Sequence, residues 1–213
     1  MLAPRVALIS ALELSIRPIR ESFDRLWPEA MRINLLDDSL SADRQADGVL
    51  TEAMIQRFLE LGRYAVRHAR ADAVLFTCSA FGEAIEAVAR DLDVPVLKPN
   101  EAMIAEAVAL GGSIGLLATF APTLDSMMLE FPPGMDIEPR LAPGALAAAE
   151  RGDFAEHDRL AAAAATAFGG RATIALAQFS LARAAPAVEA ATGARVLTTP
   201  DCAVRALRER LKA

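Results

Sequence analysis

A cysteine stands where a short apolar run gives way to a helical pattern. Cys78 follows the buried-strand pattern of residues 73–77 and precedes a helix-like segment. The carboxyl ends of parallel strands form the ligand-binding edge of an open sheet, and the positive end of a following helix favours a thiolate. We therefore predict that Cys78 is a reactive thiol. The alternative is that it fills a gap in the core as a small apolar side chain.

Composition narrows the class of protein. The 213 residues carry a net charge of −6, which gives no electrostatic footprint for nucleic acid or an anionic membrane. No apolar stretch approaches the roughly 18 residues that a membrane-spanning helix needs, and residues 1–5 lead into a strand-like run instead of a signal peptide. We therefore expect a cytoplasmic protein that binds neither nucleic acid nor membrane.

The few cysteines and histidines limit metal chemistry. Cys78, Cys202, His68 and His157 cannot build a disulfide framework or a Cys/His zinc cluster, so no metal site is predicted. His68 lies at a helix end and His157 stands between two acidic residues, and we expect both on the surface. A Cys-His or Ser-His-Asp triad is therefore not expected.

Short apolar runs alternate with longer segments of helical spacing, the pattern of repeated strand-helix units around a parallel sheet. The predicted strands cover residues 6–10, 33–36, 74–77, 94–97, 114–119, 137–141, 173–177 and 195–198. The predicted helices cover residues 16–26, 50–70, 80–91, 101–110, 122–130, 154–168, 181–192 and 203–212, and the alanine run 145–149 is further helix-forming material.

The set of four predicted strands occurs twice in the sequence. Val6 corresponds to Ile114 at an offset of 108 residues, and Cys78 corresponds to Gln178 at an offset of 100. This predicts an α/β fold of two similar lobes, 1–110 and 111–213, each with a four-stranded parallel sheet flanked by helices. We expect a pseudo-twofold duplication with a cleft between the lobes, and we allow the final helix to pack across to the first lobe. Cys78 and Gln178 then occupy equivalent places on opposite walls.

The order of these motifs resembles the aspartate/glutamate racemase superfamily, which includes hydantoin racemase, maleate isomerase and arylmalonate decarboxylase. The resemblance covers nearly the whole chain and rests on the segments 77–79, 115–119 and 176–180. It implies chemistry without a cofactor at a carbon next to a carboxylate or carbonyl of a small acid, in an enzyme that forms a homo-oligomer. In the racemases, one cysteine removes the α-proton and a second cysteine on the other lobe returns a proton to the opposite face.

This chain departs from that pattern at the second cysteine. The position holds Gln178, whose amide cannot act as a general acid or base near neutral pH. Cys202 matches Ala102 in the repeat, so we expect it to be structural. The resemblance leaves open isomerisation, decarboxylation of the arylmalonate decarboxylase kind with the thiol on the other lobe, and nucleophilic addition as in maleate isomerase. A non-catalytic small-molecule binding module is the alternative from another class.

Supporting residues are proposed at the same strand ends. Ser79 either caps its helix or donates to a substrate carboxylate, and Thr119 either caps the next helix or binds a carboxylate, as the resemblance implies. Ser10 contributes a hydroxyl at the equivalent first-lobe turn. The amide of Phe179 and the side chain of Ser180 form half of an anion cradle. The aspartates that follow residue 36 approach the same edge, although aspartates at turns are common for local reasons.

Overall fold

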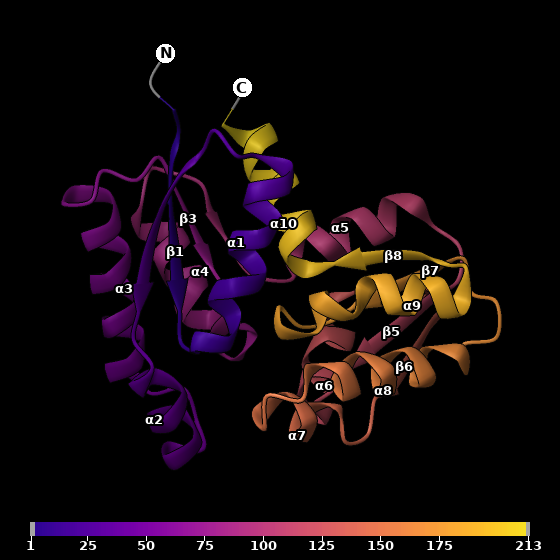
Figure 1. The fold of residues 1–213 in the computed structure, drawn as a ribbon. Helices are drawn as coiled ribbons and strands as arrows, with labels where there is room; N and C mark the ends of the chain where they lie inside the picture. The colour runs from indigo at the N-terminus through magenta and orange to yellow at the C-terminus, as the bar shows by residue number, and fades with distance from the viewer. Residues whose placement is uncertain (1–2, 212–213) are drawn as a thin grey trace. The chain divides into compact units, whose positions relative to one another are not determined.

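The computed structural model describes residues 3–211 and shows two compact α/β units (Figure 1). The first unit comprises the described residues up to Pro99 together with those from Ala203 onward, and the second runs from Asn100 to Cys202. Met1 and Leu2, which were expected to lead into the first strand, and Lys212, the expected end of the last helix, lie outside the described residues.

The first unit contains a four-stranded parallel sheet in the order β2-β1-β3-β4. Its strands are β1 (Arg5–Ser10), β2 (Met31–Leu36), β3 (Ala73–Phe76) and β4 (Val96–Leu97). Its helices are α1 (Ile16–Leu26), α2 (Ser39–Asp47), α3 (Glu52–Arg67) and α4 (Gly82–Asp91), with short 3-10 turns η1 (Glu13–Ser15) and η2 (Ser79–Phe81).

The second unit repeats this arrangement in the order β6-β5-β7-β8. Its strands are β5 (Ile114–Ala118), β6 (Ile137–Leu141), β7 (Thr173–Leu176) and β8 (Arg195–Thr198). Its helices are α5 (Glu101–Leu110), α6 (Ala121–Glu130), α7 (Ala145–Glu150), α8 (Phe154–Thr166) and α9 (Ala185–Thr192), with a 3-10 turn η3 (Ser180–Ala184). Helix α10 (Thr199–Arg210) starts in this unit and continues into the first.

These observations confirm the α/β class and the two four-stranded parallel sheets. The unit boundary differs from the expected position after residue 110. Helix α5 belongs to the second unit, because it packs on β7 and β8. The last helix from Ala203 onward belongs to the first unit, the arrangement that the sequence analysis allowed, and there Arg208 donates through Nη1 to the Leu26 carbonyl oxygen at 2.9 Å.

Both faces of the first sheet are buried, as parallel sheets require. On one face, the rings of Phe58, Phe76 and Phe81 meet at centroid distances of 5.2 and 4.8 Å, which joins α3 and η2 to β3. Val6 and Leu8 point to the other face by strand alternation and are also buried. Each such apolar side chain contributes about 1.5–3 kcal/mol when fully buried.

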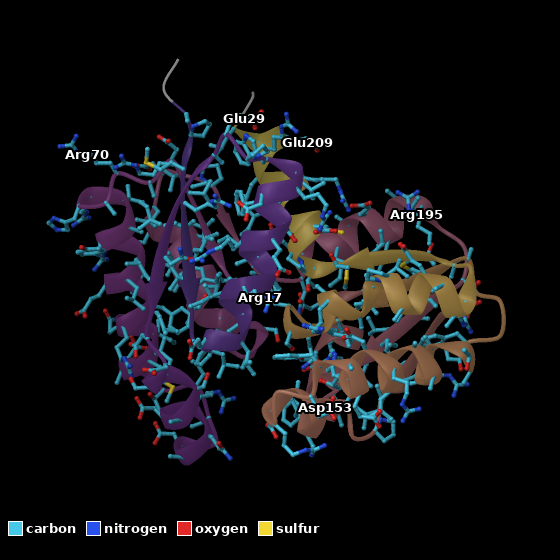
Figure 2. All side chains as sticks on the ribbon, in the orientation of Figure 1. Arg17, Glu29, Arg70, Asp153, Arg195 and Glu209 are labelled. Atoms are coloured by element: carbon cyan, nitrogen blue, oxygen red, sulfur yellow. The ribbon has the colours of Figure 1, made fainter. Side chains whose placement is uncertain are left out.

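Small residues allow close packing in the second unit. Ala161 and Ala165 lie one turn apart on α8 and are fully buried against the sheet. A Cβ added to Gly115 on β5 would lie 2.7 Å from the Phe168 ring, so glycine is what lets that ring approach the strand. Helix α8 begins after Asp153, which is labelled in Figure 2. The Oδ1 atom of Asp153 accepts from the Glu156 N–H at 3.1 Å and caps the helix.

Helix α2 was not predicted, because the acidic segment after β2 was interpreted as a turn. The segment forms a helix that ends at Gly48, whose φ of 70° only glycine adopts without strain. The predicted helix over residues 50–70 starts instead at Glu52, because the Thr51 hydroxyl oxygen accepts from the Met54 N–H and caps that end.

The expectation that His157 is exposed was wrong. The side chain is 1% exposed and its Nδ1 lies 2.8 Å from Asp158 Oδ1. Acidic neighbours suggested a surface position, but His157 shares the stripe of Ala161 and Ala165 at four-residue spacing, which is the buried face of α8. His68 is exposed and Cys202 is buried, as expected. Within residues 3–211, no helix is both long and apolar enough to span a bilayer.

Candidate functional site at the carboxyl ends of the strands

The hydrogen-bond register shows which residues of the two units are equivalent. The Thr77 N–H donates to the Ile9 carbonyl oxygen at 3.0 Å, and the Ala177 N–H donates to the Leu117 carbonyl oxygen at 2.9 Å. Each donor is the first residue after the third strand of its sheet. The next residue in each unit is Cys78 or Gln178. These two side chains therefore occupy the same position at the carboxyl edge of two equivalent sheets.

Cys78 is partly exposed and directly precedes the turn η2. Burial raises the pKa of its thiol above the ordinary value of 9.0, and a hydrogen bond with the Ala80 backbone offsets part of this effect. The expected thiolate stabilisation by the following helix is therefore not found. Burial is the largest cause of the raised pKa, and α4 begins only at Gly82, after the 3-10 turn. A neutral thiol at pH 7 is a proton donor before it is a base.

Ser10 and Thr77 connect the ends of β1 and β3 beside this thiol. Thr77 donates through Oγ1 to Ser10 Oγ at 2.9 Å, and both side chains are buried. The expected hydroxyl of Ser10 is thus present at the edge, and Thr77 fixes its position. Ser79 is the first residue of η2, and Cys78 holds the position before the turn without a side-chain cap. The capping alternative for Ser79 is therefore not realised.

The Gln178 side chain is held in one orientation by Thr119. Its Oε1 accepts from the Thr119 backbone N–H at 2.6 Å and from Thr119 Oγ1 at 2.9 Å. A backbone N–H can only donate, so the atom it meets must be the amide oxygen. The Nε2 group is therefore the end that can bind an acceptor. Phe120, and not Thr119, directly precedes α6, so the capping alternative for Thr119 is not realised either.

Phe179 and Ser180 start the turn after Gln178. Phe179 is buried, and its carbonyl oxygen accepts from the Ala182 N–H at 3.2 Å. The Leu181 N–H donates to the Gln178 carbonyl oxygen at 3.1 Å, so the turn is closed by its own backbone. The anion cradle expected from the Phe179 amide and the Ser180 side chain stays a prediction.

Sequence reasoning missed the ion pairs that support this edge. Arg183 in η3 donates from Nε and Nη2 to the two Asp158 carboxylate oxygens, each at 2.9 Å, and so fastens the turn after Gln178 to α8. In the first unit, Asp37 contacts Ser39 and Arg57. Burial alone would raise the pKa of Asp37, but the hydrogen bonds from Ser39 and Arg57 outweigh it and lower that pKa. These partners are far apart in sequence, so only the tertiary structure reveals that they pair.

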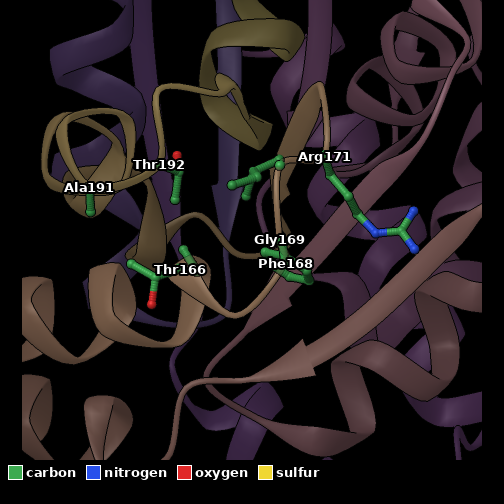
Figure 3. A pocket seen from close by; sticks show the side chains of 9 residues that line it. Thr166, Phe168, Gly169, Arg171, Ala191 and Thr192 are labelled. Atoms are coloured by element: carbon green, nitrogen blue, oxygen red, sulfur yellow. The ribbon is translucent and has the colours of Figure 1, made fainter.

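A small pocket lies elsewhere in the second unit. It measures about 120 Å³ and sits near the amino end of β7, between the ends of α8 and α9 (Figure 3). Thr166, Phe168 and Thr192 line it, and Arg171 at its rim is paired with Asp136 and Glu138 at 2.9 Å. This pocket is at the opposite end of the strands from Gln178. Within the described chain, no group of three or more His, Cys, Asp or Glu side chains could hold a metal ion.

Two equivalent parallel α/β units, with a thiol and an amide at matching strand ends, define a duplicated α/β protein whose candidate functional groups follow the third strand of each half. The chain belongs to the Asp/Glu/hydantoin racemase family, whose model matches residues 16–207. This confirms the resemblance found in the sequence. No curated protein matches the chain.

Several solved structures share the fold. Aspartate racemase from Picrophilus torridus has a TM-score of 0.74 at 11% identity, over 97% of this chain and 94% of that one. Glutamate racemase RacE1 from Bacillus anthracis has a TM-score of 0.71 at 14% identity, over 100% of this chain and 83% of that one. Allantoin racemase from Klebsiella pneumoniae has a TM-score of 0.68 at 14% identity, over 99% of this chain and 88% of that one.

Proposed function

We propose that this protein is a racemase-family enzyme that catalyses proton transfer or isomerisation at the carbon next to a carboxylate of a small acid, without a cofactor. In this proposal Cys78 is the only acid-base group. Gln178 orients the substrate through its Nε2 group, and Ser10, Ser79, Thr119, Phe179 and Ser180 are supporting residues of the substrate site.

The observation that carries the proposal is the matching position of one thiol and one fixed amide. The amide oxygen of Gln178 accepts both hydrogen bonds from Thr119, so the Nε2 group of Gln178 is left to donate. Its N–H donors suit a carboxylate or carbonyl oxygen. Donors fixed before the reaction stabilise the negative charge that develops when the α-carbon becomes planar. A single proton donor protonates one face of that planar carbon, which favours one enantiomer over a racemate.

The proton balance is simple. In one direction the Cys78 thiolate takes the α-proton, and the electron pair of the C–H bond moves into the enolate. In the other direction the neutral thiol gives its proton to that carbon, and the resulting thiolate is protonated again by solvent. Because burial raises the pKa of Cys78, the second direction is the easier one at pH 7.

The raised pKa of the Cys78 thiol favours a second candidate reaction, which is decarboxylation. There the electron pair of the broken C–C bond stays on the α-carbon as carbon dioxide leaves, and the thiol supplies the proton that fills the vacated position. This reaction needs a proton donor and no base, which fits a neutral Cys78 thiol.

Exchange of label from deuterated water tests the proposal. We expect the wild type to incorporate deuterium at the α-carbon of at least one acid from a panel of small 2-substituted acids and malonates. Removal of an acid-base group costs about 100- to 10,000-fold in rate, so Cys78→Ala should lose incorporation by that factor while Cys202→Ala keeps it. Gln178→Cys supplies a second thiol at the equivalent position and should convert exchange into racemisation.

Two results would contradict the proposal. Undiminished incorporation in Cys78→Ala would remove the role of the thiol. Binding of a small acid with neither exchange nor decarboxylation in the wild type would instead identify the non-catalytic binding module.

A further inference from the structure

The two units have edge strands at equivalent places. The second strand of each unit lies at one end of its sheet, β2 in the order β2-β1-β3-β4 and β6 in the order β6-β5-β7-β8. An edge strand turns one row of backbone N–H and C=O groups away from its own sheet, and those groups can pair with a strand of another chain. The outer rows of β2 and β6 therefore show whether each edge is open to such pairing.

The outer row of β2 is open. The Met31 N–H donates to the Pro4 carbonyl oxygen at 2.8 Å, and the Asp37 N–H donates to the Ser10 carbonyl oxygen at 3.0 Å. Because successive backbone groups alternate in direction, the odd-numbered residues of β2 bond to β1 and the even-numbered residues face outward. Within residues 3–211, the backbone groups of the outward residues have no hydrogen-bond partner. The outward residues are Arg32, Asn34 and Leu36.

The outer row of β6 is blocked. Asn34 lies opposite the central strand where Pro139 does in the second sheet, so Pro139 is its counterpart and also faces outward. Proline has no N–H and is tolerated in a sheet where the edge needs no donor. The Ile137 N–H, two residues earlier, is taken by the Met135 carbonyl oxygen of its own chain at 3.1 Å. The duplicated fold therefore has one blocked edge and one open edge.

The open edge carries none of the features that protect an edge strand. All six residues of β2 pair with β1 in an unbroken register, without a bulge, and none of them is proline or lysine. Met31 and Leu36 at its two ends are 48% and 44% exposed. A long, regular edge with exposed apolar side chains is a surface for strand pairing.

The β2 strand is complementary to itself in the antiparallel direction. With a twofold axis at Asn34, the Asn34 residues of two copies face each other and Arg32 faces Leu36 of the other copy. Each facing pair then exchanges both of its N–H···O bonds. The exposed Leu36 side chain lies along the methylene stem of Arg32, whose guanidinium stays paired with Asp24. On the other face of the sheet, Ile33 comes opposite Leu35 of the other copy, which is an apolar cross-strand pair.

We propose that two copies of this chain associate through antiparallel pairing of their β2 strands, so that the sheets of the two first units form one continuous sheet. A second copy is the occupant that suits this edge, because one twofold contact gives a partner to every outward backbone group. The inference involves none of the proposed catalytic groups and does not rest on the proposed function.

Sedimentation equilibrium tests the inference through the molar mass and the dimer Kd. We expect the wild type to sediment at twice the chain mass of 22.6 kDa. Asn34→Pro gives β2 the residue that blocks β6 and should raise the dimer Kd at least about 10-fold, because both copies lose an N–H donor. Asn34→Ala is the matched control, since it keeps the backbone N–H and should stay dimeric.

A side-chain variant tests the same contact without changing the backbone. Leu36→Lys places a cation opposite Arg32 of the other copy and should also dissociate the dimer. Leu141→Lys makes the same change at the equivalent position of the blocked edge and should leave the dimer intact. Hydrogen exchange adds a local readout: we expect the outward N–H of Asn34 to exchange slowly above the dimer Kd and fast below it.

Three results would overturn the inference. The first is a wild type that is monomeric at every concentration tested. The second is an oligomer that neither Asn34→Pro nor Leu36→Lys weakens, which would place the contact on another surface. The third is an Asn34 N–H that exchanges fast in the assembled protein. If circular dichroism shows that Asn34→Pro does not fold, the comparison of Leu36→Lys with Leu141→Lys decides by itself.

Discussion

At the scale of single residues, the proposed chemistry of this protein depends on one thiol and one amide whose surroundings differ. Burial keeps Cys78 protonated at neutral pH, whereas two hydrogen bonds from Thr119 fix the orientation of Gln178. The sequence showed the identity of both residues and their equivalence. It could not show the direction of the thiol pKa, because desolvation depends on which distant side chains surround the sulfur.

The thiol pKa leads to a prediction about alkylation. The reactive species is the thiolate, so the rate of Cys78 alkylation by iodoacetamide should increase with pH through a midpoint above the ordinary value of 9.0. We expect slow alkylation at pH 7, measured by mass spectrometry of the peptide that contains Cys78, with the Cys202→Ala variant removing the other thiol. A midpoint below pH 8 would contradict the raised pKa and restore the thiolate that the sequence alone suggested.

At the scale of elements, helix packing in each unit depends on where small residues stand. Gly115 allows the Phe168 ring to approach β5, and a Cβ there would lie 2.7 Å from the ring. The glycine is visible in the sequence, but its partner is not, since Phe168 is far along the chain and follows α8. Similarly, the acidic neighbours of His157 predicted an exposed side chain, but His157 lies on the same buried face of α8 as Ala161 and Ala165.

Gly115→Ala should destabilise the protein by about 1–3 kcal/mol, the usual cost of overpacking a core. Gly82→Ala is the matched control, because no atom lies within 4 Å of its added Cβ and its backbone is helical. Replacing a helical glycine by alanine gains roughly 0.5–1 kcal/mol, so this control should be neutral or stabilising. Urea unfolding measures both variants. Equal free energies of unfolding for Gly115→Ala and the wild type would show that Phe168 can move aside.

At the scale of the whole molecule, the chain order and the structural units do not coincide. The last helix starts in the second unit, yet its residues from Ala203 onward complete the first. Ala203, Val204 and Leu207 are fully buried, and Arg208 bonds to the end of α1. The first unit therefore includes a segment that follows the entire second unit in the sequence.

Leu207→Ala should cost about 2–5 kcal/mol through the cavity it leaves, and the loss should fall on the first unit. Hydrogen exchange would measure it: we expect faster exchange of β1 and β3 amides, with β5 and β7 amides less affected. Glu209→Ala changes an exposed residue on the same helix (Figure 2) and should leave both sheets as protected as in the wild type. Faster exchange confined to β5 and β7 would contradict the division of the chain.

The sequence by itself determined the strand-helix alternation, the duplication, the family resemblance and the pairing of Cys78 with Gln178 in the repeat. These follow from periodicity and motif order, which are local properties of the chain. Only the tertiary structure decided that Thr119 fixes Gln178, that the thiol stays protonated, that His157 is buried and that the last helix completes the first unit. Each of these depends on groups far apart in sequence, and a local pattern carries no information about which distant partner fills the space around a side chain.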